Sequence, residues 1–342
     1  MLDVGLDISG KSVVGYAVNE RKRCVYAGTA AATRAGLRAL RQQVGVGAKL
    51  VVVEAGNQLK WIAETLKRMP EVQVYVVHPN DVKWITESQG QTDRVDAKKL
   101  AELARAGILP RAGPVVEGRV RELRELVSAR QQRPSKRIAL INTIRGDVSQ
   151  EGHRLPEKFC AGPTWAAKLA QLPVSAPLRL IIETDMASIE ALLAAEQPRT
   201  ARVVAIQDPR CPLLESIPAI GPLGARVVLS ALDEARRFDD QKAVANYGAL
   251  APTIYQSGAV RQLGRINRDG RSEVRRVLLP WAQTVVRMKS AGAKPLQQFY
   301  ARIARRRGKT SAVVALARQR LTTAYGVLKS GQPYDPRKLQ PA

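Results

Sequence analysis

Four carboxylates in the first third of the chain have the types and spacing that metal-dependent phosphodiester chemistry requires. Asp7 lies in a short apolar segment, Glu54 directly follows VVV, and Asp93 and Asp96 are three residues apart in TDRVDAKKLAELAR. Residues i and i+3 share a helix face, so both aspartates can point to the same sheet edge. Hard cations such as Mg²⁺ or Mn²⁺ take oxygen ligands and clamp the attacking and leaving oxygens of a phosphodiester. The pattern predicts a Mg²⁺ or Mn²⁺ site.

Each carboxylate also has an ordinary explanation. Asp93 and Asp96 would favour a helix N-terminus electrostatically, and Glu54 could be a polar residue that ends a strand. An acid directly after three valines is less ordinary in so basic a chain. Taken together, and in this order along the chain, the four acids favour a metal site.

The elements around these acids indicate an α/β domain. Val, Ile and Tyr enrichment with polar or Gly breaks predicts a meander of three strands, followed by alternating helices and strands. The strands are expected at 2–8, 12–19, 24–31, 49–56 and 72–78, and the helices at 33–44, 58–68, about 80–87 and 93–106. This order is typical of an RNase H-like (RuvC-like) domain, which we place at 1–110.

Residues 111–205 are basic, helical in pattern and interrupted by prolines. We expect a helix at 118–132 that Pro134 breaks, a continuation at 136–148, and a further helix at 178–196 after a stretch with prolines. Their modest apolar stripes suit a coiled-coil-like arm that mediates assembly. Residues 206–342 form a third, mostly α-helical block.

Ser257 is the candidate nucleophile in that third block. It precedes Gly258, between an apolar helix and a run of arginines: Arg261, Arg265, Arg268, Arg271, Arg275 and Arg276. A serine that attacks phosphate must be exposed, deprotonated and surrounded by positive charge. No histidine is near in sequence, so activation would have to come from the metal site. Chemistry alone favours an ordinary turn serine in a Ser-Gly pair.

The segment 215–232, ESIPAIGPLGARVVLSAL, resembles a helix-hairpin-helix element. In such elements a tight turn presents backbone N–H groups to a DNA phosphate. Ala219 stands where these turns more often have Gly, and Pro222 has no N–H. A packed helix pair with no phosphate is the alternative.

Charge identifies the class of partner. The formal charge is +25, and residues 258–330 alone hold 17 Lys and Arg against two acids. Such an excess favours a polyanion. No stretch approaches the roughly 20 apolar residues of a spanning helix, and the start MLDVGLDIS is unlike a signal peptide. Three scattered cysteines and two histidines argue against a zinc finger and a disulfide framework. We therefore expect a cytoplasmic protein that binds nucleic acid.

GLDISG also resembles the first phosphate loop of actin-like kinases, which share this strand order. Those enzymes need later Gly-rich phosphate loops and a second, similar domain, and residues 115–210 offer neither. A sugar kinase has no use for the large positive charge.

The chain as a whole resembles the DEDD insertion-sequence transposases with a RuvC-like N-terminal domain and a C-terminal serine transposase domain, known as bridge-RNA-guided recombinases. The matching segments are GLDIS (5–9), VVVEAG (51–56), TDRVDAKKLAELAR (92–105), LLESIPAIG (213–221), FDDQKAVANYGALAP (238–252) with YQSG (255–258), GRINRDGRSEVRRVL (264–278) and AYGVLKSGQPYD (324–335). Only 115–205 aligns poorly.

The resemblance implies a role for each candidate residue. Asp7, Glu54, Asp93 and Asp96 fall on the family's metal ligands, and Ser257 falls on its catalytic serine, which forms a covalent link with DNA. It also implies a guide RNA, and a composite site in a dimer or tetramer whose protomers contribute different domains. The resemblance therefore favours the nucleophile over the turn serine.

We accordingly expect a transposase that cuts and rejoins DNA strands. The alternative is a structure-specific RNase H-like nuclease, such as a junction resolvase, that uses the carboxylates alone. A basic nucleic-acid-binding scaffold with a degenerate site is the third hypothesis, against which the intact set of four acids speaks. Ser257 separates recombinase from nuclease, because metal-dependent hydrolysis needs no serine.

Overall fold

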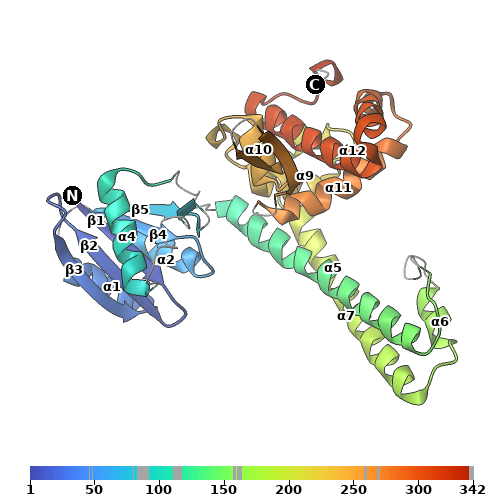
Figure 1. Cartoon of the computed structure of the whole chain (residues 1–342), viewed down its shortest axis with the longest axis horizontal. Helices are drawn as coiled ribbons and strands as arrows, with labels where there is room; N and C mark the ends of the chain where they lie inside the picture. The colour runs from blue at the N-terminus through green and yellow to red at the C-terminus, as the bar shows by residue number, and fades with distance from the viewer. Residues whose placement is uncertain are drawn as a thin grey trace. The chain divides into compact units, whose positions relative to one another are not determined.

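The computed structural model describes residues 1–45, 47, 49–79, 81–82, 92–110, 118–156, 159, 164–257, 260–267 and 270–338. The chain divides into two compact units, Met1–Val116 and Glu117–Ala342, which are described here one at a time (Figure 1). The first is a mixed α/β unit and the second is largely helical.

The N-terminal unit is built on a five-stranded sheet with the order β3-β2-β1-β4-β5. The strands are β1 (Leu2–Ile8), β2 (Ser12–Val18), β3 (Cys24–Ala31), β4 (Lys49–Glu54) and β5 (Val72–Val77). β1, β2 and β3 form an antiparallel meander, whereas β4 and β5 run parallel to β1. The meander and the alternating elements expected from the sequence are confirmed; most of the helix expected at 80–87 lies outside the described residues.

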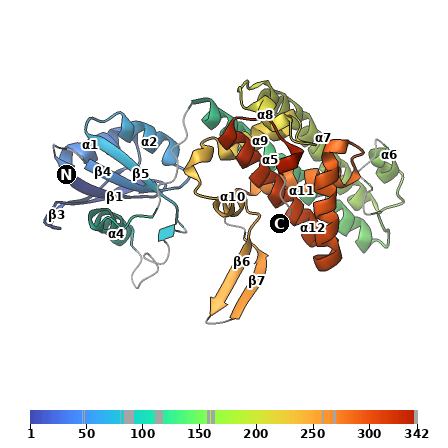
Figure 2. The same ribbon diagram turned by 90° about the horizontal axis from the view of Figure 1, so that it is seen from above.

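Helices cover both faces of this sheet. α1 (Arg34–Val44) and α2 (Leu59–Lys67) lie on one side and α4 (Asp93–Ala106) on the other (Figure 2). Strand side chains alternate between faces, so the sheet contributes residues to two hydrophobic cores. Val4, Leu6 and Val53 pack with α1 and α2, while Val52 and Val77 pack with α4.

The backbones of β1 and α4 approach each other closely. Gly5 makes it possible, because a Cβ at this position would lie 2.0 Å from the carbonyl oxygen of Ala97 and 2.7 Å from the amide nitrogen of Ala101. Only a residue without a side chain lets the two backbones meet here. The helix is thereby seated directly on the strand that carries Asp7.

The C-terminal unit is a bundle of helices with one small sheet. Its elements are α5 (Gly118–Gln150), α6 (Trp165–Ala170), α7 (Ala176–Ala205), α8 (Cys211–Glu215), α9 (Pro222–Leu232), η2 (Ala235–Arg237), α10 (Gln241–Tyr247), β6 (Pro252–Ser257), β7 (Val260–Ile266), α11 (Ser272–Arg287), η3 (Ala291–Ala293), α12 (Lys294–Ser330) and η4 (Pro336–Lys338). α9 is buried from Gly224 to Leu232 and contributes to the main core.

α5 and α7 pack side by side as a long helical pair that carries α6 near its end (Figure 1). Leu123, Val127 and Val203 join the main core of the unit. A separate cluster that includes Ile144, Ile182 and Ile189 holds the other end together.

The expected break at Pro134 is wrong, because α5 continues through it as one 33-residue helix. A proline removes the hydrogen bond to the carbonyl four residues earlier, here that of Arg130, and crowds it. Contacts with α7 compensate: Arg130 donates to Thr200 Oγ1 at 2.8 Å and to Glu196 Oε1 at 2.9 Å. Tertiary packing thus overrides the local preference. α7 likewise extends beyond the expected 178–196 and contains Pro198.

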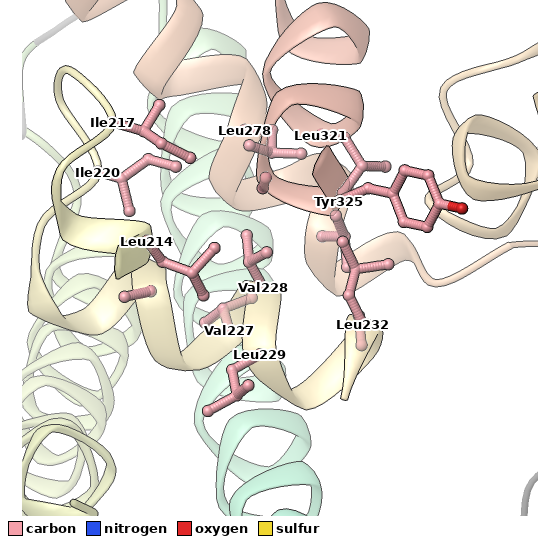
Figure 3. Close-up of a cluster of buried hydrophobic side chains, with 14 of the residues drawn as sticks. Leu214, Ile217, Ile220, Val227, Val228, Leu229, Leu232, Leu278, Leu321 and Tyr325 are labelled. Atoms are coloured by element: carbon pink, nitrogen blue, oxygen red, sulfur yellow. The ribbon is translucent and has the colours of Figure 1, made fainter. Parts of the chain in front are cut away.

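α8 and α9 form the helix pair expected at 215–232. Ile217 and Ile220 of the connecting turn are buried and point into the core cluster that also holds Leu214, Leu278 and Leu321 (Figure 3). Ala219 adopts a left-handed φ of 60°, the conformation for which glycine is the usual residue. The buried Arg320 stabilises the turn by donating a hydrogen bond to the carbonyl oxygen of Pro218.

The sequence analysis missed the hairpin of β6 and β7, which projects from the helices (Figure 2). Its signal is present: PTIYQS and VRQLGRI are two β-compatible runs separated by exactly two residues, as in a two-residue hairpin turn.

The contact at Gly5 generates a prediction. Gly5→Ala should lower the free energy of unfolding by about 1–3 kcal/mol, because the methyl group forces the α4 backbone away from β1. Urea denaturation measures the effect. Gly10→Ala is the matched control, since a Cβ there meets no atom within 4 Å. Equal stability of Gly5→Ala and wild type would contradict the close packing.

Candidate active site

Strand alternation places Asp7 and Glu54 side by side. The register of the parallel pair matches Gly5 with Val52 and Leu6 with Val53, so Asp7 and Glu54 are next in line. Gly5 contacts α4 and Val52 packs in the α4 core. Because residues two apart on a strand share a face, both carboxylates emerge on the α4 side, at the carboxyl ends of their strands.

The first turn of α4 brings the two aspartates to the same place. Thr92 is the N-cap, and its hydroxyl accepts a hydrogen bond from Val95 N at 3.3 Å. Asp93 is exposed and Asp96 is partly buried. Asp96 Oδ1 is buried and has no hydrogen-bond partner, a costly state for a carboxylate oxygen.

The electrostatics show that the four acids converge. Burial and the charge of Asp93, with smaller contributions from Asp96 and Glu54, raise the pKa of Asp7 to about 6, although the Ile8 N–H bonded to it opposes this. Burial and the charge of Asp96 raise the pKa of Glu54, which His78 partly offsets. Like charges that disfavour ionisation are the signature of carboxylates sharing one site.

Asp3 lies on the same strand face as Asp7 but has a different role. It is 2% exposed and forms an ion pair with Arg105 at 3.0 Å, near the far end of α4. Burial raises the pKa of Asp3 above its ordinary value, and the charge of Arg105 offsets only part of this. On this strand, Asp3 has a cation partner, and their ion pair anchors the helix. Asp7, in contrast, is surrounded by other acids. The sequence analysis did not single out Asp3.

The residues fit a divalent cation in donor type and charge. All four donors are carboxylates, the ligands that Mg²⁺ and Mn²⁺ prefer, and their mutual repulsion is what a cation would relieve. Among the described residues, no group of three or more Asp, Glu, His or Cys side chains is already arranged so that it could hold a metal ion. The acids are therefore gathered electrostatically at one edge without forming a closed set of ligands.

Ser257 belongs to the C-terminal unit and is the last residue of β6, where it pairs with Val260 across the hairpin. The only histidine in this unit, His153, follows α5, where its Nε2 lies 2.8 Å from the carbonyl of Pro173. The imidazole of His153 is thus engaged with the backbone just before α7.

Some of the arginines expected to surround Ser257 with positive charge have structural roles instead. Arg275 and Arg276 contact the carbonyls of Ala249 and Gln131 at 3.5 and 3.3 Å, so they hold α11 to its neighbours. Arg265 is exposed. The side chain of Arg261 and residue Arg268 lie outside the described part of the chain.

An arginine cluster around Tyr247, at the base of the hairpin, was missed. Arg237 lies 4.5 Å from the centre of the Tyr247 ring, and Arg271 N donates to the Tyr247 carbonyl at 2.7 Å. Burial alone would raise the pKa of Tyr247, but the charges of Arg124, Arg271 and Arg237 lower it. Arg124 comes from α5, far away in sequence, so no local pattern could reveal this cluster.

Comparison with known proteins follows the same division of the chain. A family model named DEDD_Tnp_IS110 and described as a transposase matches residues 4–150. A second, described as the transposase IS116/IS110/IS902 family, matches residues 211–298. The first match contains all four carboxylates and the second contains Ser257.

Individual relatives agree. The chain is 24% identical over 338 residues to the transposase for insertion sequence element IS1111A of Coxiella burnetii, covering 96% of this chain and 87% of that protein. It is 24% identical over 296 residues to a probable family 20 transposase of Pseudomonas aeruginosa, covering 84% and 86%. It is 32% identical over 131 residues to the pilin gene-inverting protein of Moraxella bovis.

That last alignment covers 37% of this chain and 39% of the inverting protein, so the chain matches about two fifths of that relative's length. The two transposases, in contrast, align over most of their length. The two family models together cover about two thirds of the sequence, and the chain belongs to the IS110 family of transposases, which are DNA recombinases.

Proposed function

We propose that this transposase cuts and rejoins DNA with a divalent cation, Mg²⁺ or Mn²⁺, held by Asp7, Glu54, Asp93 and Asp96, and with Ser257 as its nucleophile. The observation that carries the proposal is the convergence of the four acids, expressed in the pKa of about 6 at Asp7. A scaffold protein would have no reason to keep such repulsion.

The topology of the N-terminal unit supports an RNase H-like fold. The antiparallel meander β1-β2-β3 is joined to the parallel strands β4 and β5, with helices on both faces. Asp7 on the central strand and Glu54 on its neighbour lie at the carboxyl ends of these strands. When bound, a divalent cation would stabilise the charge that develops on the phosphodiester oxygens. The chain's own contribution is to hold four carboxylates on α4 and on two adjacent strands.

The position of Ser257 supports its role as nucleophile. It is the last residue of β6, in a hairpin that projects from the helices. Because its own unit supplies no imidazole base, activation must come from the carboxylate site. We infer that the active form contains more than one copy of the chain, so that one copy's serine can meet another copy's carboxylates.

Recombination accounts for the relatives better than hydrolysis does. The name of the Moraxella bovis relative describes the inversion of a gene, and inversion requires strands to be rejoined as well as cut. The large positive charge is compatible with DNA together with a structured guide RNA, which we also propose.

Repulsion among the acids predicts an unusual effect on stability. In EDTA near neutral pH, Asp7→Asn should raise the free energy of unfolding by on the order of 1 kcal/mol, a value kept small because this half-exposed carboxylate is screened by water. Thermal or urea denaturation measures it. Asp208→Asn is the control: its hydrogen-bonded partner Arg210 lowers the pKa of this carboxylate, so the change should destabilise the protein. If the two variants behaved alike, Asp7 would be a structural residue.

The metal-site proposal also predicts a separation of binding from catalysis. Asp96→Asn should reduce strand transfer roughly 100-fold or more and leave binding of nucleic acid nearly unchanged, because the lost ligand acts on the reacting phosphate. Gel shifts and a recombination assay in Mg²⁺ test this. Glu102→Gln, an exposed position on the same helix, should be active. Near-normal recombination by Asp96→Asn would refute the site.

The nucleophile has a direct chemical test. Wild-type protein incubated with cognate DNA and Mg²⁺ should form a covalent adduct that survives denaturation, and mass spectrometry should map the phosphoryl link to Ser257. Ser257→Ala should bind nucleic acid normally and form no adduct. Thr253→Ala, on the same strand, should keep it. Cleavage by Ser257→Ala at the wild-type rate would show that water is the nucleophile and that the protein is a nuclease.

A further inference from the structure

A basic cavity lies on the face of the N-terminal sheet opposite α4. It has a volume of about 440 Å³ and lies between α1 and the end of α2. Its lining residues are Arg34, Arg38, Arg41, Gln42, Thr65, Arg68, Met69 and Pro70. The lining thus holds four arginines and no acid.

The periodicity of α1 aligns three of these arginines. Arg34, Arg38 and Arg41 are spaced i, i+4 and i+7, so they follow one face of the helix over about 10 Å. The adjacent face, about 90° around the helix, buries Leu37, Leu40 and Val44 in the core. The apolar side of the helix therefore fixes the direction in which the row of arginines faces.

Neighbouring acids neutralise this row only in part. Arg34 lies 4.0 Å from Glu64 and Arg41 lies 3.9 Å from Glu71, distances at the limit of an ion pair. Within the described part of the chain, Arg38 and Arg68 form no ion pair. Surface pairs of this kind contribute little, so the cavity keeps a net positive charge.

Two buried groups show that this charge is held at a cost. Arg41 Nε is buried and has no hydrogen-bond partner. Lys49 is 2% exposed at the start of β4, and burial together with the charge of Arg41 lowers its pKa. An anion beside the Arg41 guanidinium would offset the positive charge that Arg41 exerts on Lys49.

The row begins at the sheet edge that carries the four carboxylates. Ala31 at the end of β3 pairs with Ser12, and Ile8 next to Asp7 pairs with Val13. The ends of β1 and β3 therefore share that edge, and α1 starts three residues after Ala31. From Arg34 the helix leads away from the carboxylates and along the opposite face.

We propose that the α1–α2 cavity binds the phosphodiester backbone of DNA and guides the strand toward or away from the carboxylate edge. Guanidinium groups match phosphate oxygens with two parallel hydrogen bonds, and the spacing of the row suits successive phosphates of one strand. DNA is the partner because it is the polymer that must reach this edge. The inference rests on the proposed function for the place of cleavage, and its binding step does not depend on the nucleophile.

The test compares two variants that lose the same charge. Arg38→Ala/Arg68→Ala removes the two cavity arginines without ion-pair partners. Arg21→Ala/Arg23→Ala removes two exposed arginines from the turn between β2 and β3, at the other end of the sheet. Binding of a DNA duplex is measured by fluorescence anisotropy across a salt series in EDTA, where no cleavage occurs. A structured RNA of equal length is measured in parallel.

The cavity variant should bind DNA about 10-fold more weakly at moderate salt, and the slope of log affinity against log salt should become shallower by roughly 2, one for each lost phosphate contact. Arg38→Lys/Arg68→Lys should restore most of the slope, which a folding defect would not allow. The turn variant should change the slope by less than half as much.

An unchanged salt slope, an equal effect of the turn variant, or a loss confined to the RNA would each overturn the proposal. Failure of the proposed function remains distinguishable, because Asp7→Asn and Ser257→Ala should bind DNA with the wild-type salt slope.

Discussion

The direct contact of α4 with β1 through Gly5 is the constraint on which the carboxylate edge depends. It brings a helix backbone against a strand backbone with no side chain between them. The first turn of the helix is thereby seated at the height of Asp7, and the ion pair between Asp3 and Arg105 secures its far end. A helix held at both ends in this way cannot slide, so Asp93 and Asp96 stay beside the two strand carboxylates.

The strength of that scaffold explains how the protein tolerates its site. Burial, together with the charges of the neighbouring acids, raises the pKa of Asp7 and Glu54, so keeping these carboxylates ionised at this edge costs free energy. Hydrophobic packing in the two cores, one on each face of the sheet, offsets this free-energy cost. Strain concentrated at one edge of a well-packed domain is typical of a functional site. The same unit keeps a net positive charge in the α1–α2 cavity, on the other face of its sheet.

The C-terminal unit shows how packing supplies what local sequence does not. α5 passes through Pro134 because Arg130 and Glu196 tie it to α7 at that level. The arginines near Ser257 are divided between structure and surface, since Arg275 and Arg276 brace α11. Tyr247 is instead surrounded by three arginines from separate segments of the chain: Arg124, Arg237 and Arg271. The turn of the helix pair is fixed by Ile217 and Ile220 in the core and by Arg320 beneath it.

The sequence by itself determined the order of the N-terminal elements, because apolar runs of period two and amphipathic helices leave a clear pattern. It also pointed to Asp7, Glu54, Asp93 and Asp96, since their residue type and spacing carry the chemistry. The family resemblance singled out Ser257, which residue chemistry alone would have passed over. Only the tertiary structure separated Asp3 from Asp7, because two acids on one strand face differ solely in what the packed helix sets beside them. It alone decided the continuity of α5, the cluster around Tyr247 and the α1–α2 cavity. Each of these depends on contacts between residues far apart in the chain, and no local pattern encodes them.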